Sequence, residues 1–258
     1  MYAFKACCVN LHLEGEKVTS DQKSQLVNDY RYLILVHGSV LNPIQRRFGK
    51  GGRDQWEESD VKKHLMAVFN VPEENVYLPD WGGRNQSDSR HTGGTIIANY
   101  LHDILKKNPF AEILLVGYSH GGNAANIGLN ILAQRNASGD DGFNLDQITL
   151  LNTATPAMYD YRLLTSTQAL INAHLNFYNH RDFVQQTGAL IGSSSRRMNV
   201  DGHEVGRAHH GAINQSVTLD VPSGLKDPFG VLAHGRMRSS PKIWKTYKIP
   251  QIRAAKDW

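Results

Sequence analysis

The sequence lacks a disulfide framework, a long apolar run and a secretion signal. Its 258 residues include two cysteines, Cys7 and Cys8, which are adjacent and so are expected to be small buried side chains rather than a bridge. No apolar run reaches the length of a membrane span, and the N-terminus has no basic region followed by a clean apolar stretch. We therefore expect a soluble protein made in the cytoplasm, which would be secreted, if at all, without a cleaved signal peptide.

Strong charge of either sign is also missing. The formal net charge is +4 at pH 7, with 20% charged and 40% hydrophobic residues, so a core is expected and global disorder is not. Basic residues are scattered apart from the pairs Arg46-Arg47 and Arg196-Arg197, and no stripe of basic and aromatic residues appears. This pattern argues against a nucleic-acid partner and leaves an anionic membrane surface as the more plausible one.

Aliphatic runs alternate with amphipathic segments, and no internal repeat is visible. This alternation predicts βαβ units and one α/β domain over 1–258, with a mostly parallel central sheet and helices on both faces. The flanking parts are an N-terminal extension at 1–30 and a candidate lid or insertion loop at 183–212. We expect strands at 30–39, 75–83, 111–119, 147–156, 174–182 and 212–222, and helices at 56–70, 93–108, 121–135 and 239–249.

A serine with glycines two residues before and after it ends the segment expected to form the strand at 111–119. Gly-Tyr-Ser-His-Gly, centred on Ser119, joins a buried strand to a helix, which is the setting of a nucleophile elbow. Side chains at Gly117 or Gly121 would collide with the neighbouring turn. The alternative is an ordinary glycine-rich turn or a phosphate loop, although the Lys-Ser/Thr pair of a Walker motif is absent.

The first long strand ends in His37-Gly38-Ser39. In folds with such an elbow, a backbone N–H from the loop after an earlier strand helps to form the oxyanion hole. We expect the N–H of Ser39 to serve there together with the N–H of His120. His37 is then a residue that shapes the loop, and not a base.

A serine nucleophile needs a base and an orienting acid, in the chain order Ser, Asp or Glu, His. Asp182 follows a predicted strand beyond the elbow and is the first candidate for the acid, unless it merely caps the next helix. Asp160 is the reserve candidate. The base is expected in a loop between the last strand and the C-terminal helix, a position that His234 fits better than His209 or His210.

Several histidines lie close together between the predicted acid and the predicted base. A rival interpretation makes them, with one glutamate, a metal cluster: His203, Glu204, His209 and His210. Their spacing does not match a helical His-Glu-x-x-His site, and the segment is predicted to be a loop. We therefore expect no metal ligands and no cofactor.

The motifs LILVHGS, VGYSHGGN and LAHGRMRSSPKIW together resemble the α/β-hydrolase superfamily over about 32–244. DWGGRNQSDSR followed by GYSHGGNAA is similar, more narrowly, to bacterial lipase-like hydrolases, a group that includes phospholipase effectors of type VI secretion. The chain departs from that pattern in having Trp-Gly-Gly where Trp-Ser-Gly is expected, and Tyr118 where many members carry His. Both departures bear on substrate preference, and neither removes a catalytic atom.

The resemblance implies hydrolysis of carboxylic esters, such as lipid or phospholipid acyl esters, through an acyl-enzyme. It implies Ser119 as nucleophile, Asp182 as acid and His234 as base, without a cofactor. Substrate contacts are expected from His37, Gly38, Trp81 and Tyr118. Trp81, with Arg84 and Asn85, lies in a loop near the site, and an architectural role is equally open for these three residues.

The resemblance also implies partners. They are a lipid or small ester substrate, a membrane surface that the paired arginines could meet, and an inhibitory immunity protein if the chain is a delivered toxin. The same fold also hosts small-molecule esterases and thioesterases, and a non-catalytic binding protein on a hydrolase scaffold is a further alternative. The acyl length and the headgroup do not follow from the sequence.

Overall fold

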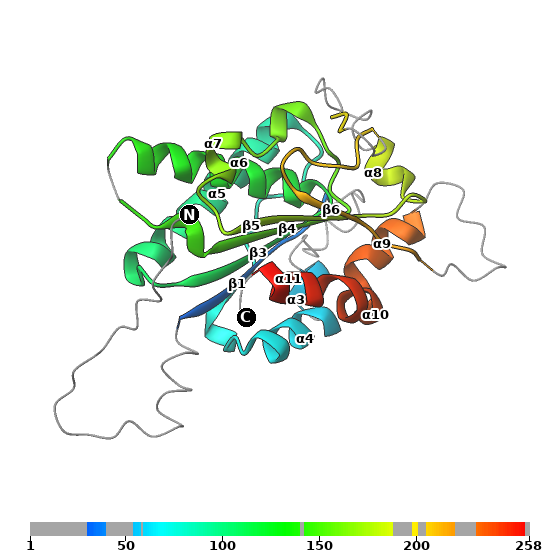
Figure 1. Ribbon diagram of the computed structural model, residues 1–258, viewed down its shortest axis with the longest axis horizontal. Coiled ribbons are helices and arrows are strands. Elements are labelled where there is room, and N and C mark those ends of the chain that lie inside the picture. The colour runs from blue at the N-terminus through cyan, green and yellow to red at the C-terminus, as the bar shows by residue number, and fades with distance from the viewer. Residues whose placement is uncertain are drawn as a thin grey trace, which may run out of the picture.

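The aliphatic runs form a parallel sheet with helices on both faces (Figure 1). A computed structural model of the protein describes residues 30–39, 54–57, 59–139, 142–187, 198–200, 205–219 and 231–255. Within them, the strand order is β2-β1-β3-β4-β5-β6 and every neighbouring pair is parallel. The strands are β1 (Arg31–Val36), β2 (Val76–Tyr77), β3 (Glu112–Tyr118), β4 (Ile148–Thr153), β5 (Ala173–Tyr178) and β6 (Ile213–Ser216).

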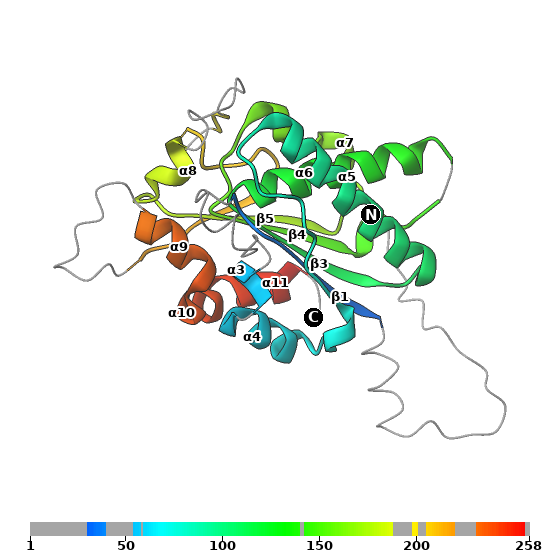
Figure 2. The ribbon, with the colours of Figure 1, turned by 180° about the vertical axis from the view of Figure 1, so that it is seen from behind.

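Two layers of helices cover the sheet, and both views show the same division (Figures 1 and 2). One face carries α5 (Ser87–Lys107) and α6 (His120–Ala137). The other carries α4 (Asp60–Phe69), α9 (Val231–Ser239) and the C-terminal helices. These are α10 (Pro241–Ile243), the π-helix η4 (Trp244–Lys248) and α11 (Ile249–Ala255). Of the described helices, none is both long enough and apolar enough to cross a membrane.

Alternation along the strands divides the core into two clusters, because successive side chains of a strand point to opposite faces. In β1, Leu33 and Leu35 pack with α4 and η4, whereas Ile34 and Val36 pack with α5 and α6. All four are fully buried. Burial on both faces explains why β1 reads as a continuous apolar run in the sequence.

Most predicted elements are confirmed, with differences at their ends. The predicted helix 56–70 is two helices, α3 (Asp54–Glu57) and α4, because Ser59 caps α4 by accepting a hydrogen bond from the Lys62 N–H at 3.1 Å. Helix α5 begins at Ser87, six residues before the predicted start. Strand β2 has only two residues. The closing helix is present, but it is divided into α10, η4 and α11.

The strand order places a switch point between β1 and β3. The chain passes from β1 to β2 on one side and then crosses to β3 on the other, so the connections diverge above this pair of strands. In open parallel sheets, ligands bind at the carboxyl ends of the strands beside such a point. The parallel sheet, its two helical layers and the serine between β3 and α6 make this an α/β-hydrolase fold.

Two buried histidines, His174 of β5 and His209, belong to a buried polar layer beside β4 and β5. The Asn152 amide donates to His174 Nε2 at 3.0 Å, and His209 Nε2 faces the Thr155 carbonyl at 3.4 Å, so that nitrogen carries the proton. The two imidazole rings lie 5.5 Å apart. Burial lowers the pKa of His174 well below its usual range and that of His209 to about 4, because charging either ring would cost its hydration.

These histidines predict a loss of stability in mild acid. Unfolded histidine titrates near pH 6.5, so between about pH 6.5 and pH 4 the unfolded chain binds more protons than the folded one. The free energy of unfolding should fall as the pH falls through this window, with His209 accounting for up to about 3 kcal/mol. Urea unfolding at several pH values measures this slope.

The matched pair for that measurement is His209→Gln and His210→Gln, because His210 is the exposed neighbour. We expect the first substitution to flatten the dependence on pH and the second to leave it unchanged. Equal slopes in both variants and the parent would contradict the assignment to His209.

Candidate functional site

Ser119 lies between β3 and α6 in a strained backbone conformation. Its φ of 52° and ψ of −134° are rare for a residue with a side chain, and such strain costs about 1–3 kcal/mol. Two hydrogen bonds hold it there: Ser119 N–H donates to the Thr153 carbonyl at 3.0 Å, and Gly122 N–H donates to the Ser119 carbonyl at 3.0 Å. The turn therefore presents the serine at the carboxyl edge of the sheet.

Close packing around this turn explains its glycines. A Cβ on Gly121 would overlap the His37 carbonyl oxygen, and a Cβ on Gly117 would lie 2.8 Å from the Gly122 nitrogen. A Cβ on Gly38 would lie 2.8 Å from Ser119 Cβ. The loop after β1 therefore passes directly beside the serine, and Ser39 and His120 are the residues that follow Gly38 and Ser119 in the chain.

His37 and Trp81 shape that loop. Their rings stack with centroids 5.4 Å apart, and the Trp81 indole N–H donates to the His37 carbonyl at 3.0 Å. His37 Nδ1 lies 2.8 Å from the Gly38 carbonyl, and both aromatic side chains are buried. This geometry favours the architectural role for Trp81 over direct substrate contact.

The rest of the Trp81 loop is tied to an arginine that sequence reasoning missed. Arg90 is completely buried and donates to Asn85 Oδ1 at 2.7 Å and to the Tyr161 hydroxyl at 3.2 Å. Arg84 is exposed. Since Arg90 falls in the first turn of a helix, its position in the sequence resembles that of an ordinary surface charge.

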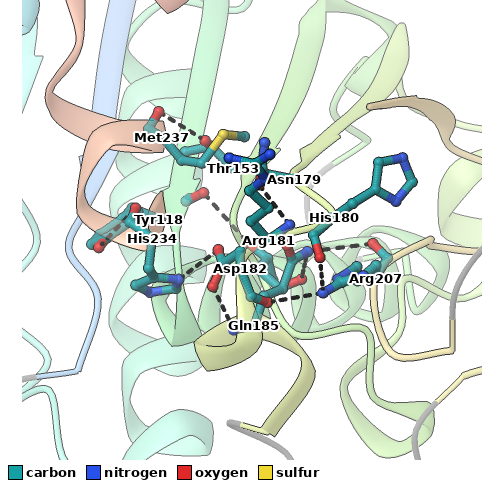
Figure 3. Close-up of polar contacts among 12 residues, drawn as sticks. Tyr118, Thr153, Asn179, His180, Arg181, Asp182, Gln185, Arg207, His234 and Met237 are labelled. Atoms are coloured by element: carbon teal, nitrogen blue, oxygen red, sulfur yellow. Dashed lines mark hydrogen bonds and ion pairs between the residues drawn. The ribbon is translucent and has the colours of Figure 1, made fainter. Parts of the chain in front are cut away.

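The predicted acid and the predicted base are in direct contact. His234 Nδ1 lies 2.8 Å from Asp182 Oδ2, and Asp182 is fully buried (Figure 3). Its other oxygen, Oδ1, accepts the Gln185 N–H at 2.8 Å. Asp182 therefore fulfils both alternatives, because it caps the start of α8 (Phe183–Thr187) and also binds the histidine. A carboxylate only accepts, so the Nδ1 of His234 carries the proton and its Nε2 is left as the acceptor.

His234 lies on helix α9, which corrects the expectation that it would be in a loop. The sequence did not predict this helix, because VLAHGRMRS has weak apolar periodicity and contains Gly235. Ala233 and Met237 nevertheless join the core beneath the sheet. The tertiary contacts of these two residues, and not helix propensity, explain why the segment is helical.

A network of backbone contacts holds the Asp182 turn. Arg207 donates to the His180 carbonyl at 2.6 Å and, more weakly, to the Asp182 carbonyl at 3.4 Å (Figure 3). Gln185 donates through Nε2 to the Thr155 carbonyl at 2.8 Å. Burial lowers the pKa of Arg207, an effect that the nearby Asp182 charge opposes. Sequence reasoning missed Arg207, because a lone arginine in a polar loop gives no signal.

Tyr118 contacts the His234 side of the site. Its hydroxyl donates to the His234 carbonyl at 3.4 Å, and the two rings lie 5.1 Å apart at 41° (Figure 3). Burial raises the pKa of Tyr118, so the phenol stays neutral at physiological pH. Tyr118 is 8% exposed, which leaves only a small part of it available to a substrate.

The remaining candidate acids, bases and metal ligands of the sequence analysis differ in their burial and in whether the structure describes them. His209 faces Thr155 in the buried polar layer, whereas His210 and Asp160 are exposed. His203 and Glu204 lie outside the described residues, as do Arg46, Arg47, Arg196 and Arg197 and the parts of the candidate lid at 188–197 and 201–204. Among the residues that are described, no group of three or more His, Cys, Asp or Glu could hold a metal ion. That the protein needs no metal stays a prediction.

Comparisons with known proteins give a family match to part of the chain and a similarity to solved structures. The family model of class 3 lipases matches residues 91–190, a segment that contains Ser119 and Asp182 but ends before His234. No curated protein sequence matches the chain. A YdeN-like hydrolase from Pectobacterium atrosepticum is a similar solved structure, at 15% identity over 67% of this chain and 83% of that chain, with a TM-score of 0.30. The central segment is thus similar to class 3 lipases, and the described residues have the α/β-hydrolase fold.

Proposed function

We propose that the protein is a serine esterase that cleaves carboxylic esters through an acyl-enzyme. The observation that carries this proposal is the Asp182–His234 hydrogen bond at the sheet edge where the strained Ser119 also lies. In the proposed roles, Ser119 is the nucleophile, His234 the general base and Asp182 the group that orients the imidazole. The match to class 3 lipases supports an ester as the substrate.

The reaction follows from the protonation state of the imidazole. Ser119 Oγ attacks the ester carbonyl and passes its proton to His234 Nε2, while Asp182 holds Nδ1–H and stabilises the imidazolium. His234 then gives that proton to the leaving alcohol. In the second step, water attacks the acyl-enzyme and passes a proton to His234 Nε2, which returns it to Ser119 Oγ as the carboxylic acid leaves.

The oxyanion of each tetrahedral intermediate needs donors that are already in place. We assign the backbone N–H groups of Ser39 and His120 to this role. His120 is the first residue of α6, where the helix dipole favours negative charge, and the contact between Gly38 and Ser119 brings the Ser39 loop to the same place.

We expect Ser119→Ala to remove turnover of a p-nitrophenyl ester, by about 10⁴-fold or more in kcat, because the activated oxygen is lost. Circular dichroism should be unchanged, and a fluorophosphonate probe should no longer label the protein. Ser138→Ala, at an exposed serine, is the matched control and should retain both properties. A folded Ser119→Ala variant with a tenth of the parent turnover would refute the nucleophile assignment.

His234→Ala should lower kcat as much as Ser119→Ala does. The double variant should be no slower than either single variant, because members of a triad act as a unit. His210→Ala, at an exposed histidine, should keep full activity. Steady-state kinetics of the four proteins decides the point, and an active His234→Ala variant would show that another group is the base.

We extend the proposal to lipids, with acyl esters of anionic or zwitterionic phospholipids as substrates. Two large apolar side chains support this extension, because they are exposed beside the candidate residues. Phe183, directly after Asp182, is 45% exposed, and Leu232, two residues before His234, is 42% exposed. They lie on α8 and α9, which are in contact at this edge of the protein. An acyl chain would find apolar surface there.

Leu232→Ser should reduce the release of fatty acid from phospholipid vesicles by several-fold and leave turnover of a short soluble ester unchanged. The reason is that only the long acyl chain would reach the exposed leucine. Mass spectrometry of the products measures the first activity, with Leu170→Ser, at a distant exposed leucine, as the control. If no phospholipid or glyceride loses an acyl chain, a small-molecule esterase or thioesterase is the better assignment.

The biological setting is part of the same proposal. The resemblance to type VI phospholipase effectors suggests a toxin that acts on a membrane surface and is held inactive by an immunity protein. A non-catalytic binding protein on this fold would not label with a fluorophosphonate, so the probe separates that alternative directly.

A further inference from the structure

Lys248 is a lysine in the core. It ends the π-helix η4, its exposed fraction is 0%, and no carboxylate among the described residues pairs with it. Burial lowers the pKa of its amine well below the usual range. Burying a lysine amine without a counter-charge costs free energy unless other groups bind the amine.

The amine of Lys248 reaches two oxygens and a ring. It donates to Thr153 Oγ1 at 2.6 Å and, at short range, to the Met237 carbonyl, and it lies 4.1 Å from the centre of the Trp244 ring. An ammonium has three donors for these three partners, and a neutral amine still has two donors for the two oxygens. The two hydrogen bonds therefore hold in either protonation state.

Both oxygens belong to elements that carry the candidate site. Thr153 is the last residue of β4, and its carbonyl accepts the Ser119 N–H at 3.0 Å. Met237 lies on α9, three residues after His234, so the two share one side of the helix. The Thr153 hydroxyl also donates to the Met237 carbonyl at 3.2 Å.

The last turn of α9 is capped from η4. The carbonyls at the end of a helix lack intrahelical partners. Lys248 satisfies the Met237 carbonyl, and the Trp244 indole N–H donates to the Arg238 carbonyl at 2.7 Å. A basic group at this end is also favoured by the helix dipole. The C-terminal segment therefore fixes the end of α9 against the end of β4.

We propose that Lys248 is a positioning residue for His234: by joining α9 to β4, its amine sets where the imidazole lies relative to Ser119. This inference rests on the proposed function for its effect on catalysis. The Asp182 hydrogen bond orients the ring, but the helix backbone decides where the ring is. A displacement of about 1 Å in such a site can cost about 10²-fold in rate.

The test compares Lys248→Met with Lys245→Met, which removes an exposed lysine from the same π-helix. We expect Lys248→Met to lower kcat for a short p-nitrophenyl ester by about 10- to 100-fold while KM stays within about twofold. Lys245→Met should match the parent. A folded Lys248→Met variant that loses stability but keeps the parent kcat has lost only packing, and it would overturn the proposal.

A second readout does not need activity. The His234 Nδ1–H bound to Asp182 should give a low-field proton resonance, assigned by its absence in His234→Ala. We expect it to move or broaden in Lys248→Met and to stay in place in Lys245→Met, and an unchanged resonance in Lys248→Met would overturn the proposal. If the parent neither turns over an ester nor labels with a fluorophosphonate, the proposed function fails, and this resonance still tests the positioning role.

Should Lys248→Met not fold, Thr153→Val takes its place. It keeps the shape of the threonine and removes the hydroxyl between Lys248 and Met237. A fall in kcat of several-fold with a shifted resonance supports the proposal. A folded Thr153→Val protein with the parent kcat and resonance overturns it.

Discussion

The positive φ of Ser119 is the constraint on which the site depends. A residue with a side chain avoids this conformation unless its surroundings impose it. Two sets of contacts impose it. The Thr153 carbonyl of β4 accepts the serine N–H, and the loop after β1 packs closely through Gly38 against Ser119 and through the His37 carbonyl against Gly121. The strain is local, but the contacts that maintain it are distant in sequence, so the serine takes this conformation only in the folded sheet.

The second half of the site uses backbone contacts in the same way. Asp182 is bound by Gln185 on one oxygen and by His234 on the other, and Arg207 holds the carbonyls of its turn. On the opposite side, η4 caps the helix that carries His234. Both Asp182 and His234 are therefore held by contacts with other segments, and the proposed catalysis would need such a fixed geometry.

Sequence patterns predicted the strands and the elbow well, because β1, β3 and β4 are buried on both faces and so appear as continuous apolar runs. Ser119 and Asp182 stand at the ends of such strands, where chain order and topology restrict the choice. His234 was selected by its order in the chain, and yet it lies on a helix that the sequence concealed. The helix forms because Ala233 and Met237 meet the core, a contact that periodicity cannot reveal.

Local pattern therefore determined the fold class, the glycine-bound turn at Ser119 and the acidic residue after β5, since each depends on neighbours in the chain. Tertiary structure alone decided that His234 meets Asp182 from a helix, that Asp182 both caps a helix and binds that histidine, and that Arg90, Arg207 and Lys248 are buried. In the sequence these three basic residues look like surface charges. Their partners are carbonyls, two hydroxyls, an amide and aromatic rings, and most of them come from distant segments, so no short stretch of sequence contains the information that places them.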